Sequence, residues 1–190
     1  MLELLLVRPG TTDFDLEERI LGTLDVPLSK EADPEIAKMT REFSGQSIDA
    51  VYTSPSQSSV QTAEHIGNVL SMKSKTLSRL INLNMGLWQG MLVEEVKRKQ
   101  PKVFKQWLSQ PTTICPPEGE MLQTAQQRVE AALAKIFKKH KDGKVIIVAP
   151  EPLASLIGSV SRKTQLKDVC QPNGGRWEAI ELETPVLTNV

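Results

Sequence analysis

The chain has 190 residues, of which 39% are hydrophobic and 24% charged, as is usual for a globular protein with a substantial core. Lysine and arginine together number 23, as do aspartate and glutamate, so the formal net charge is zero. This balance gives no electrostatic reason to expect a nucleic acid or an anionic membrane as a partner. The short basic runs at 97–99 and 138–144 are interpreted as solvated helix surfaces.

The two cysteines, Cys115 and Cys170, have no close partner along the chain. They predict neither a disulfide framework nor a zinc site, and two free thiols favour a reducing compartment. The apolar N-terminal run has no basic region before it and leads straight into Arg8, so it does not match a signal peptide. No stretch reaches the roughly 20 apolar residues of a membrane span. We therefore expect a cytoplasmic protein.

Strand and helix patterns alternate from the N-terminus onward. Residues 2–7 form a short apolar run typical of a strand buried in a parallel sheet, and residues 34–43 can form a helix. A second short strand at 48–52 leads into Thr53-Ser54-Pro55, a helix-start signal, and the helix that follows continues to residue 70. Residues 75–79 are predicted as a third strand.

A helical insertion occupies about 92–118, with its helices ending near residue 108. Pro101 is expected to divide it, because proline lacks an amide hydrogen. The clearest helix spans 120–140 and has one continuous apolar stripe. A strand at 144–149, a helix at 152–162 and a last strand at 177–182 complete the pattern. This order predicts one α/β domain over residues 1–190, with helices on both faces of a mostly parallel sheet in three α/β/α layers.

Ligands bind such sheets at the carboxyl ends of the strands. Two of these ends have unusual sequences, Val7-Arg8-Pro9-Gly10 and Val148-Ala149-Pro150-Glu151. Together with six further motifs, they resemble the histidine phosphatase superfamily of phosphoglycerate mutase-like proteins, whose members have Arg-His-Gly after the first strand. In the family's order, these motifs are Leu-Gly-Thr-Leu-Asp-Val-Pro-Leu-Ser at 21–29, Thr-Ser-Pro at 53–55 with Gln-Thr-Ala-Glu at 61–64, Gly-Leu-Trp-Gln-Gly at 86–90, Pro-Glu-Gly-Glu at 117–120 with Arg128, the strand at 145–149, and Pro-Asn-Gly at 172–174.

The resemblance implies a phosphoglycerate mutase-like fold whose insertion overhangs the pocket. In the family, a neutral histidine attacks phosphorus and forms a phosphohistidine. Two arginines and a second histidine hold the phosphoryl oxygens, and a carboxylic acid protonates the leaving oxygen. Arg8 matches the first phosphate-binding arginine.

Four positions that carry chemistry in the family hold residues unable to perform it here. Pro9 stands at the nucleophile and Pro150 at the second histidine, and a proline ring has no basic lone pair. Ser58 stands at the second arginine, so that a bidentate cation becomes a neutral hydroxyl. Asn82 occupies the usual proton-donor position, and an amide is no general acid near neutral pH. Thr11 also replaces an acidic residue that is common just after the opening motif.

Other residues could in principle supply part of the chemistry. One branch of the superfamily uses an acid directly after its second histidine as the proton donor, and Glu151 stands there. The alternative, which we favour, is that Glu151 is an anion at a helix N-terminus. Cys115 lies in the insertion, but the sequence names no base or cation to activate its thiol. His65 and His140 are expected to be surface or packing histidines.

Three classes of function remain open. The favoured one is a pseudoenzyme domain with a binding, regulatory or structural role, because loss of a nucleophile alone costs about a million-fold in rate. The second is an enzyme with a changed mechanism that uses Glu151, Cys115 or a bound water. The third is a non-catalytic binder of a phosphate or carboxylate through Arg8. The parent activity, mutase or phosphatase, is left open by these motifs.

A ligand in the old pocket is expected to meet residues of the matched motifs, namely Arg8, Gly10, Thr11, Ser58, Asn82 and Glu151. No cofactor is expected, and no metal, because potential ligands do not cluster at metal-binding spacing. A small anion at Arg8, a protein partner or a homodimer is each compatible with the sequence.

Overall fold

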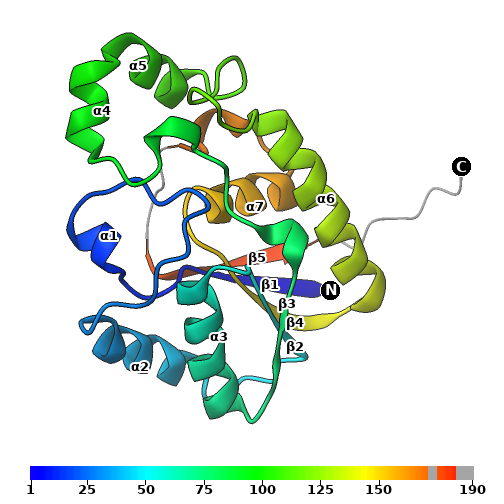
Figure 1. The fold of residues 1–190 in the computed structure, drawn as a ribbon. Coiled ribbons are helices and arrows are strands. Elements are labelled where there is room, and N and C mark those ends of the chain that lie inside the picture. The colour runs from blue at the N-terminus through cyan, green and yellow to red at the C-terminus, as the bar shows by residue number, and fades with distance from the viewer. Residues whose placement is uncertain (171–174, 183–190) are drawn as a thin grey trace, which may run out of the picture.

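A five-stranded sheet forms the centre of the molecule in the computed structural model, which describes residues 1–170 and 175–182 (Figure 1). Its strands are β1 (Leu2–Val7), β2 (Ala50–Thr53), β3 (Ser74–Thr76), β4 (Gly143–Val148) and β5 (Trp177–Leu182). They lie in the order β3-β2-β4-β1-β5, and all neighbours are parallel except β5, which pairs antiparallel with β1. The predicted α/β fold with a mostly parallel sheet is confirmed. The motif at 172–174 lies outside the described residues.

Helices cover both faces of the sheet (Figure 1). One layer contains α2 (Ala32–Phe43) and α3 (Gln57–Leu70), and the other contains α6 (Leu122–Lys139) and α7 (Leu153–Arg162). Successive side chains of a strand point to opposite faces, so β1 contributes to two separate cores. Leu4 and Leu6 pack with α6 and α7, whereas Leu5 and Val7 pack with α2 and α3. The result is the expected α/β/α arrangement.

The insertion contains two helices, α4 (Val93–Lys99) and α5 (Pro101–Ser109), and Pro101 begins the second of them. The fully buried Trp88, at the end of the short 3-10 helix η2 (Gly86–Trp88), connects the insertion to the rest of the protein. Its ring packs against Phe104 and Trp107 of α5, with centroid distances of 5.7 and 5.8 Å. Aromatic contacts of this kind hold α5 beside the carboxyl ends of the strands.

The third strand differs from its prediction. The sequence predicted a strand over 75–79, but β3 ends at Thr76, and residues Ser78–Leu80 form a 3-10 turn, η1. Arg128 on α6 accounts for this difference, because its guanidinium donates hydrogen bonds to the carbonyl oxygens of Arg79 and Ile81. These two carbonyl groups are held by a side chain, and the chain turns there instead of extending the sheet.

Besides η1 and η2, the sequence did not predict α1 (Asp13–Leu16) and the 3-10 helix η3 (Leu166–Asp168). A capping box closes α1: the hydroxyl of Thr12 accepts a hydrogen bond from the amide of Asp15, and the Asp15 carboxylate accepts one from the amide of Thr12. Helices of a single turn are too short to show a hydrophobic period in the sequence. Within the two described ranges, no helix is both long and apolar enough to cross a membrane.

Candidate functional site

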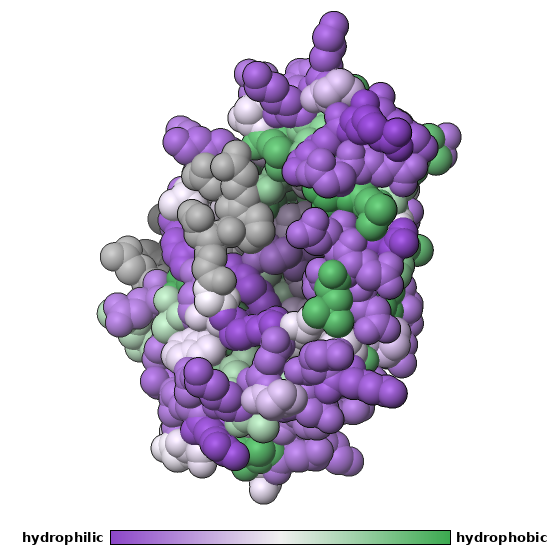
Figure 2. All heavy atoms as spheres, turned by 90° about the vertical axis from the view of Figure 1, so that its left-hand side faces the viewer, coloured by the Kyte–Doolittle hydropathy of each residue, from purple (hydrophilic) through white to green (hydrophobic). Residues whose placement is uncertain are grey.

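A cavity of about 590 Å³ lies at the carboxyl ends of the parallel strands. Val7 of β1 pairs with Val148 of β4, so the residues that follow these strands leave the sheet next to each other. Arg8, Pro9, Pro150 and Glu151 therefore line the same cavity, as the sequence predicted, although they are far apart in the chain. Figure 2 looks onto this face, where the surface is hollowed between hydrophilic residues below and the insertion above.

The wall opposite the strand ends is largely apolar. Val93 of α4 and Phe104, Trp107 and Leu108 of α5 line it, together with Met85 and other apolar residues. The insertion thus supplies packing surface and, along this wall, no charge. Such a wall suits an apolar group better than the oxygens of a phosphate.

Arg8 is held by acidic neighbours inside the cavity. Its Nε atom lies 2.5 Å from Oε1 of Glu151, and its Nη2 atom lies 3.4 Å from Oε1 of Glu178 on β5. Nη1 donates to the carbonyl oxygen of Gly175 at 3.3 Å. Only 12% of the Arg8 side chain is exposed. All three nitrogens of the guanidinium group thus already have partners within the chain.

Glu151 binds Arg8 and also caps a helix. Its Oε2 atom accepts hydrogen bonds from the amide of Ser155 at 3.1 Å and from the Ser155 hydroxyl at 2.8 Å. Ser155 lies in the first turn of α7, where unpaired amides attract negative charge. The Glu151 carboxylate therefore lies between a guanidinium and a helix N-terminus, a combination that would otherwise bind an external anion. This geometry agrees with the helix-terminus interpretation of Glu151.

Pro9, Pro150 and Ser58 occupy the positions at which the resemblance implies two histidines and an arginine. Both prolines are buried, and both line the cavity. Ser58, in the first turn of α3, is fully buried and lines the cavity as well. Its hydroxyl has no hydrogen-bond partner among the described residues. The site therefore presents an unpaired neutral hydroxyl where a phosphate would need a cation.

Asn82, Gly10 and Cys115 lie outside the cavity lining. Asn82 is only 2% exposed, and its amide donates to the carbonyl oxygens of Gly22 at 2.9 Å and Glu151 at 3.0 Å. It joins loops behind the cavity. Gly10 is buried and donates its amide to the Thr62 hydroxyl at 3.1 Å. The half-buried Cys115 lies in the loop after α5 and does not reach the cavity.

Arg176 belongs to the site but was missed by sequence reasoning. It precedes β5, and its Nη atoms donate to the carbonyl oxygen of Pro9 at 2.8 Å and to the Thr11 hydroxyl at 2.7 Å. It also forms an ion pair with Glu35 of α2. Burial acts to raise the pKa of Glu35, but hydrogen bonds from Thr11 and the charge of Arg176 outweigh it and lower this pKa. Sequence reasoning could have found Arg176 only if the last strand had been predicted as antiparallel. An antiparallel β5 starts at the edge where the parallel strands end, so the residue before it lies at the cavity.

Arg19 is a second missed cation of the cavity lining. Its Nε atom lies 2.5 Å from Glu17, and its Nη1 atom donates to the carbonyl oxygen of Gly90 at 2.8 Å. Its place just before the 21–29 motif is the only sequence signal that could have found it. Like Arg8 and Arg176, Arg19 is paired with a carboxylate, so each arginine that lines the cavity is neutralised by a neighbour.

Cys170 is the cysteine that lines the cavity. Burial raises the pKa of its thiol to about 12, so it stays protonated near neutral pH. His65 is exposed on α3, and His140 follows α6, where its ring contacts the Tyr52 hydroxyl at 2.9 Å. Burial also lowers the pKa of His140. Neither histidine lines the cavity.

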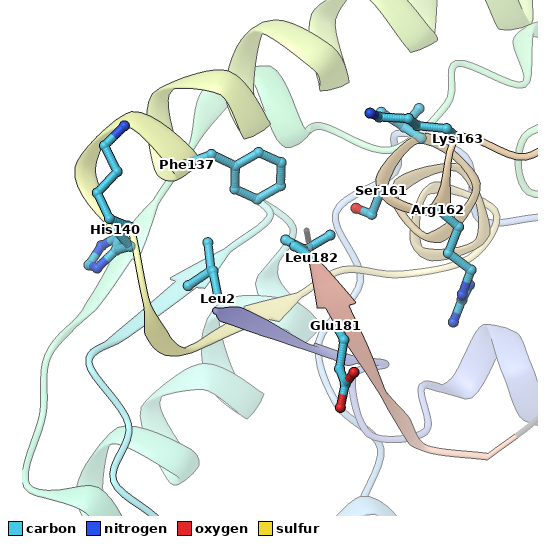
Figure 3. A pocket seen from close by; sticks show the side chains of 10 residues that line it. Leu2, Phe137, His140, Ser161, Arg162, Lys163, Glu181 and Leu182 are labelled. Atoms are coloured by element: carbon cyan, nitrogen blue, oxygen red, sulfur yellow. The ribbon is translucent and has the colours of Figure 1, made fainter. Parts of the chain in front are cut away.

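His140 instead borders another cavity, of about 540 Å³, near the N-terminal end of β1. Figure 3 shows how Leu2, Phe137 and Leu182 converge on it from β1, α6 and β5. None of the residues matched to catalytic positions lies there. The cavity at the carboxyl edge is therefore the candidate functional site.

The strand order, the two helical layers and the cavity between two strand ends define an α/β protein of the phosphoglycerate mutase-like class. The profile of the histidine phosphatase superfamily (branch 1) matches residues 4–159, and the chain belongs to this family.

Relatives and solved structures agree with this assignment. Phosphoserine phosphatase 1 of Hydrogenobacter thermophilus is 31% identical over 149 residues, which cover 78% of this chain and 71% of that protein. Phosphoglycerate mutase-like protein 4 of Arabidopsis thaliana is 29% identical over 149 residues, covering 77% of this chain and 65% of that protein. Bacillus stearothermophilus YhfR has the same fold, with a TM-score of 0.84 at 23% identity, covering 96% of this chain and 92% of that one.

Proposed function

We propose that this chain is a non-catalytic member of the histidine phosphatase superfamily, with a binding, regulatory or structural role. One observation carries the proposal. Pro9 and Pro150 replace both imidazoles, and the remaining phosphate-binding arginine, Arg8, is paired with Glu151 from the facing strand end. Among the residues that the structure describes, the site thus has neither imidazole at these two positions and no unpaired cation at the phosphate position.

Neither Ser58 nor Cys170 of the cavity lining supplies the missing nucleophile. A hydroxyl or thiol needs an adjacent base or a lowered pKa to attack phosphorus. The Ser58 hydroxyl has no partner among the described residues, and burial raises the pKa of the Cys170 thiol. Two relatives are named as a phosphoserine phosphatase and a phosphoglycerate mutase-like protein. Loss of the nucleophile from such a site costs about a million-fold in rate.

The two alternatives receive less support. A changed mechanism through Glu151 would require a carboxylate whose two oxygens already bind Arg8 and Ser155. A mechanism through Cys115 would require a thiol that reaches the cavity, and Cys115 does not line it. An anion that binds through Arg8 would first have to displace Glu151. A reused cavity is therefore better suited to a neutral, largely apolar ligand than to a phosphate.

The test is a phosphatase assay with p-nitrophenyl phosphate and phosphoserine. The phosphoserine phosphatase of Hydrogenobacter thermophilus serves as the positive control. We expect the purified chain to release phosphate no faster than buffer. Turnover well above buffer by protein free of host phosphatases would overturn the proposal. If that turnover disappeared in Glu151→Gln or Cys115→Ser, the changed mechanism would be the better account.

A further inference from the structure

A groove with an unusual charge lies beside the second half of α6. It runs between this helix and the segment β3–η1, which pack against each other along the right-hand side of Figure 1. The groove has a volume of about 300 Å³. Its lining includes four cationic side chains, those of Lys75, Arg79, Lys135 and Lys139. No acidic residue lines it.

These four cations have no carboxylate partner, unlike three arginines elsewhere in the described residues. Arg8, Arg128 and Arg176 each form an ion pair with a carboxylate. None of the ion pairs formed within residues 1–170 and 175–182 includes a groove lysine or Arg79. The chain has a net charge of zero, so this surface is a local excess of positive charge. A recess lined by one sign of charge concentrates ions of the opposite sign.

Two of the ammonium groups influence each other. Lys75 and Lys139 both line the groove, and interaction with the Lys75 side chain, together with repulsion between the two positive charges, lowers the pKa of Lys139. Lys135 lies one helical turn before Lys139 on the same side of α6. Like charges at this spacing destabilise each other. An anion bound between them would convert the repulsion into two charge-assisted hydrogen bonds.

The floor of the groove is apolar. It contains the ring of Tyr52, which is 4% exposed, and the buried side chain of Ile136. The volume is at the lower end of the range found for small-molecule sites. A concave recess of this size fits a compact ligand better than an extended nucleic acid or a flat membrane surface.

We propose that this groove binds a small soluble polyanion carrying two or more phosphate groups, with Lys75, Lys135 and Lys139 as its principal ligands. The inference goes beyond the proposed function, because no residue lines both the groove and the cavity at the carboxyl edge. Either can fail without the other.

Titration calorimetry with inorganic pyrophosphate, at constant ionic strength, tests the proposal. We expect binding by the wild-type chain. Lys75→Ala and Lys139→Ala should each weaken binding about tenfold, the loss that corresponds to one charge-assisted hydrogen bond. Lys139→Glu should abolish binding and raise the thermal midpoint without ligand, because the new carboxylate pairs with Lys75. Lys139→Glu stays informative if an alanine variant folds poorly.

Two variants control for binding elsewhere. Lys102→Ala removes an exposed lysine of α5 outside the groove and should leave the affinity unchanged. Arg8→Gln should leave it unchanged as well, because Arg8 lies in the other cavity. Absence of binding in wild type would overturn the proposal. So would a loss in Lys102→Ala equal to that in Lys139→Ala, which would indicate non-specific attraction, or a loss confined to Arg8→Gln, which would move the anion to the cavity.

Discussion

At the scale of single residues, the site carries its own anion. Arg8 could bind a phosphoryl group only if its guanidinium were free, yet it contacts Glu151 and Glu178. Glu151 is held in turn by the first turn of α7. In the proposed function, prolines in place of imidazoles at positions 9 and 150 remove the reaction, and the Glu151 carboxylate separately opposes binding of an anion at Arg8. These are two different physical obstacles, and they can be tested one at a time.

Removal of Glu151 should release Arg8 for external anions. We expect phosphate or vanadate to leave the thermal midpoint of the wild-type chain unchanged and to raise that of Glu151→Ala, because ligand binding to the native state stabilises it. Without ligand, the variant should lose about 1–3 kcal/mol of stability, the cost of an unsatisfied charged partner. Differential scanning fluorimetry measures both effects.

The double variant Arg8→Gln with Glu151→Ala is the control for this prediction. It should lose the anion-induced shift, because the guanidinium is absent. An equal shift in the wild-type chain would show that Glu151 does not block Arg8.

At the scale of secondary-structure elements, the sequence was most informative where an element has a strong internal pattern. The bounds predicted for β1 are those observed, and the stripe of α6 is buried as expected. The bounds of β5 also agree, although its alternation of apolar and polar residues is imperfect. The orientation of β5 could not be predicted, because a short strand carries no local signal for its pairing partner. The predicted end of β3 was wrong because Arg128, more than 45 positions away in the chain, donates hydrogen bonds to the carbonyl oxygens of Arg79 and Ile81.

In the candidate site, too, local sequence patterns were predictive and contacts between distant segments were not. Arg8, Pro9, Ser58, Pro150 and Glu151 line the cavity as predicted, because each follows or closely follows the end of a parallel strand. Asn82 was expected among the ligand contacts. It lies behind the cavity, because its amide donates hydrogen bonds to the carbonyl oxygens of two loops. A sequence motif gives no indication of such a contact.

Arg128 should be a major stabilising residue at the element scale. It bonds both oxygens of Glu120 at 2.9 Å and also three carbonyl groups of the segment around η1, joining α6 to that segment. Arg128→Ala leaves Glu120, which is 16% exposed, without its cationic partner. We expect a loss of about 2–4 kcal/mol in the free energy of unfolding, measured with urea.

Two further substitutions on α6 calibrate this value. Arg128→Lys should recover less than half of the loss, because an ammonium cannot reproduce the planar fork of hydrogen bonds. Glu130→Ala, an exposed position of the same helix, should change stability by no more than about 0.5 kcal/mol. A small effect of Arg128→Ala would show that the network contributes little.

At the scale of the whole molecule, stability should decrease in two steps as the pH falls. Burial lowers the pKa of His140 below its ordinary value of 6.5. As the pH falls, His140 is therefore protonated in the unfolded chain before it is protonated in the native state, and the native state loses stability below about pH 6.5. Glu35 also has a lowered pKa, because hydrogen bonds from Thr11 and the charge of Arg176 outweigh its burial. The stability that ionised Glu35 contributes is fully present above its unfolded-state pKa of 4.5. It is lost as the pH falls through the lower pKa that Glu35 has in the native state.

Urea midpoints measured from pH 8 to pH 3 check this profile. His140→Gln should remove the first decrease and keep the second, whereas Glu35→Gln should do the reverse. His65→Gln, at an exposed histidine, should preserve both. A first decrease that persisted in His140→Gln would assign it to another group.

The antiparallel pairing of β5 with β1 has a consequence for the order in which the protein is made. Arg176 and Pro9 are separated by 167 positions, yet a hydrogen bond joins them at the rim of the cavity. During synthesis, the first strand of the sheet is finished long before its last neighbour leaves the ribosome. Until then, Arg8 lacks Glu178, Thr11 lacks Arg176 and one edge of β1 is bare. A chaperone that recognises unpaired strand edges would therefore have its longest opportunity at the very residues that form the site.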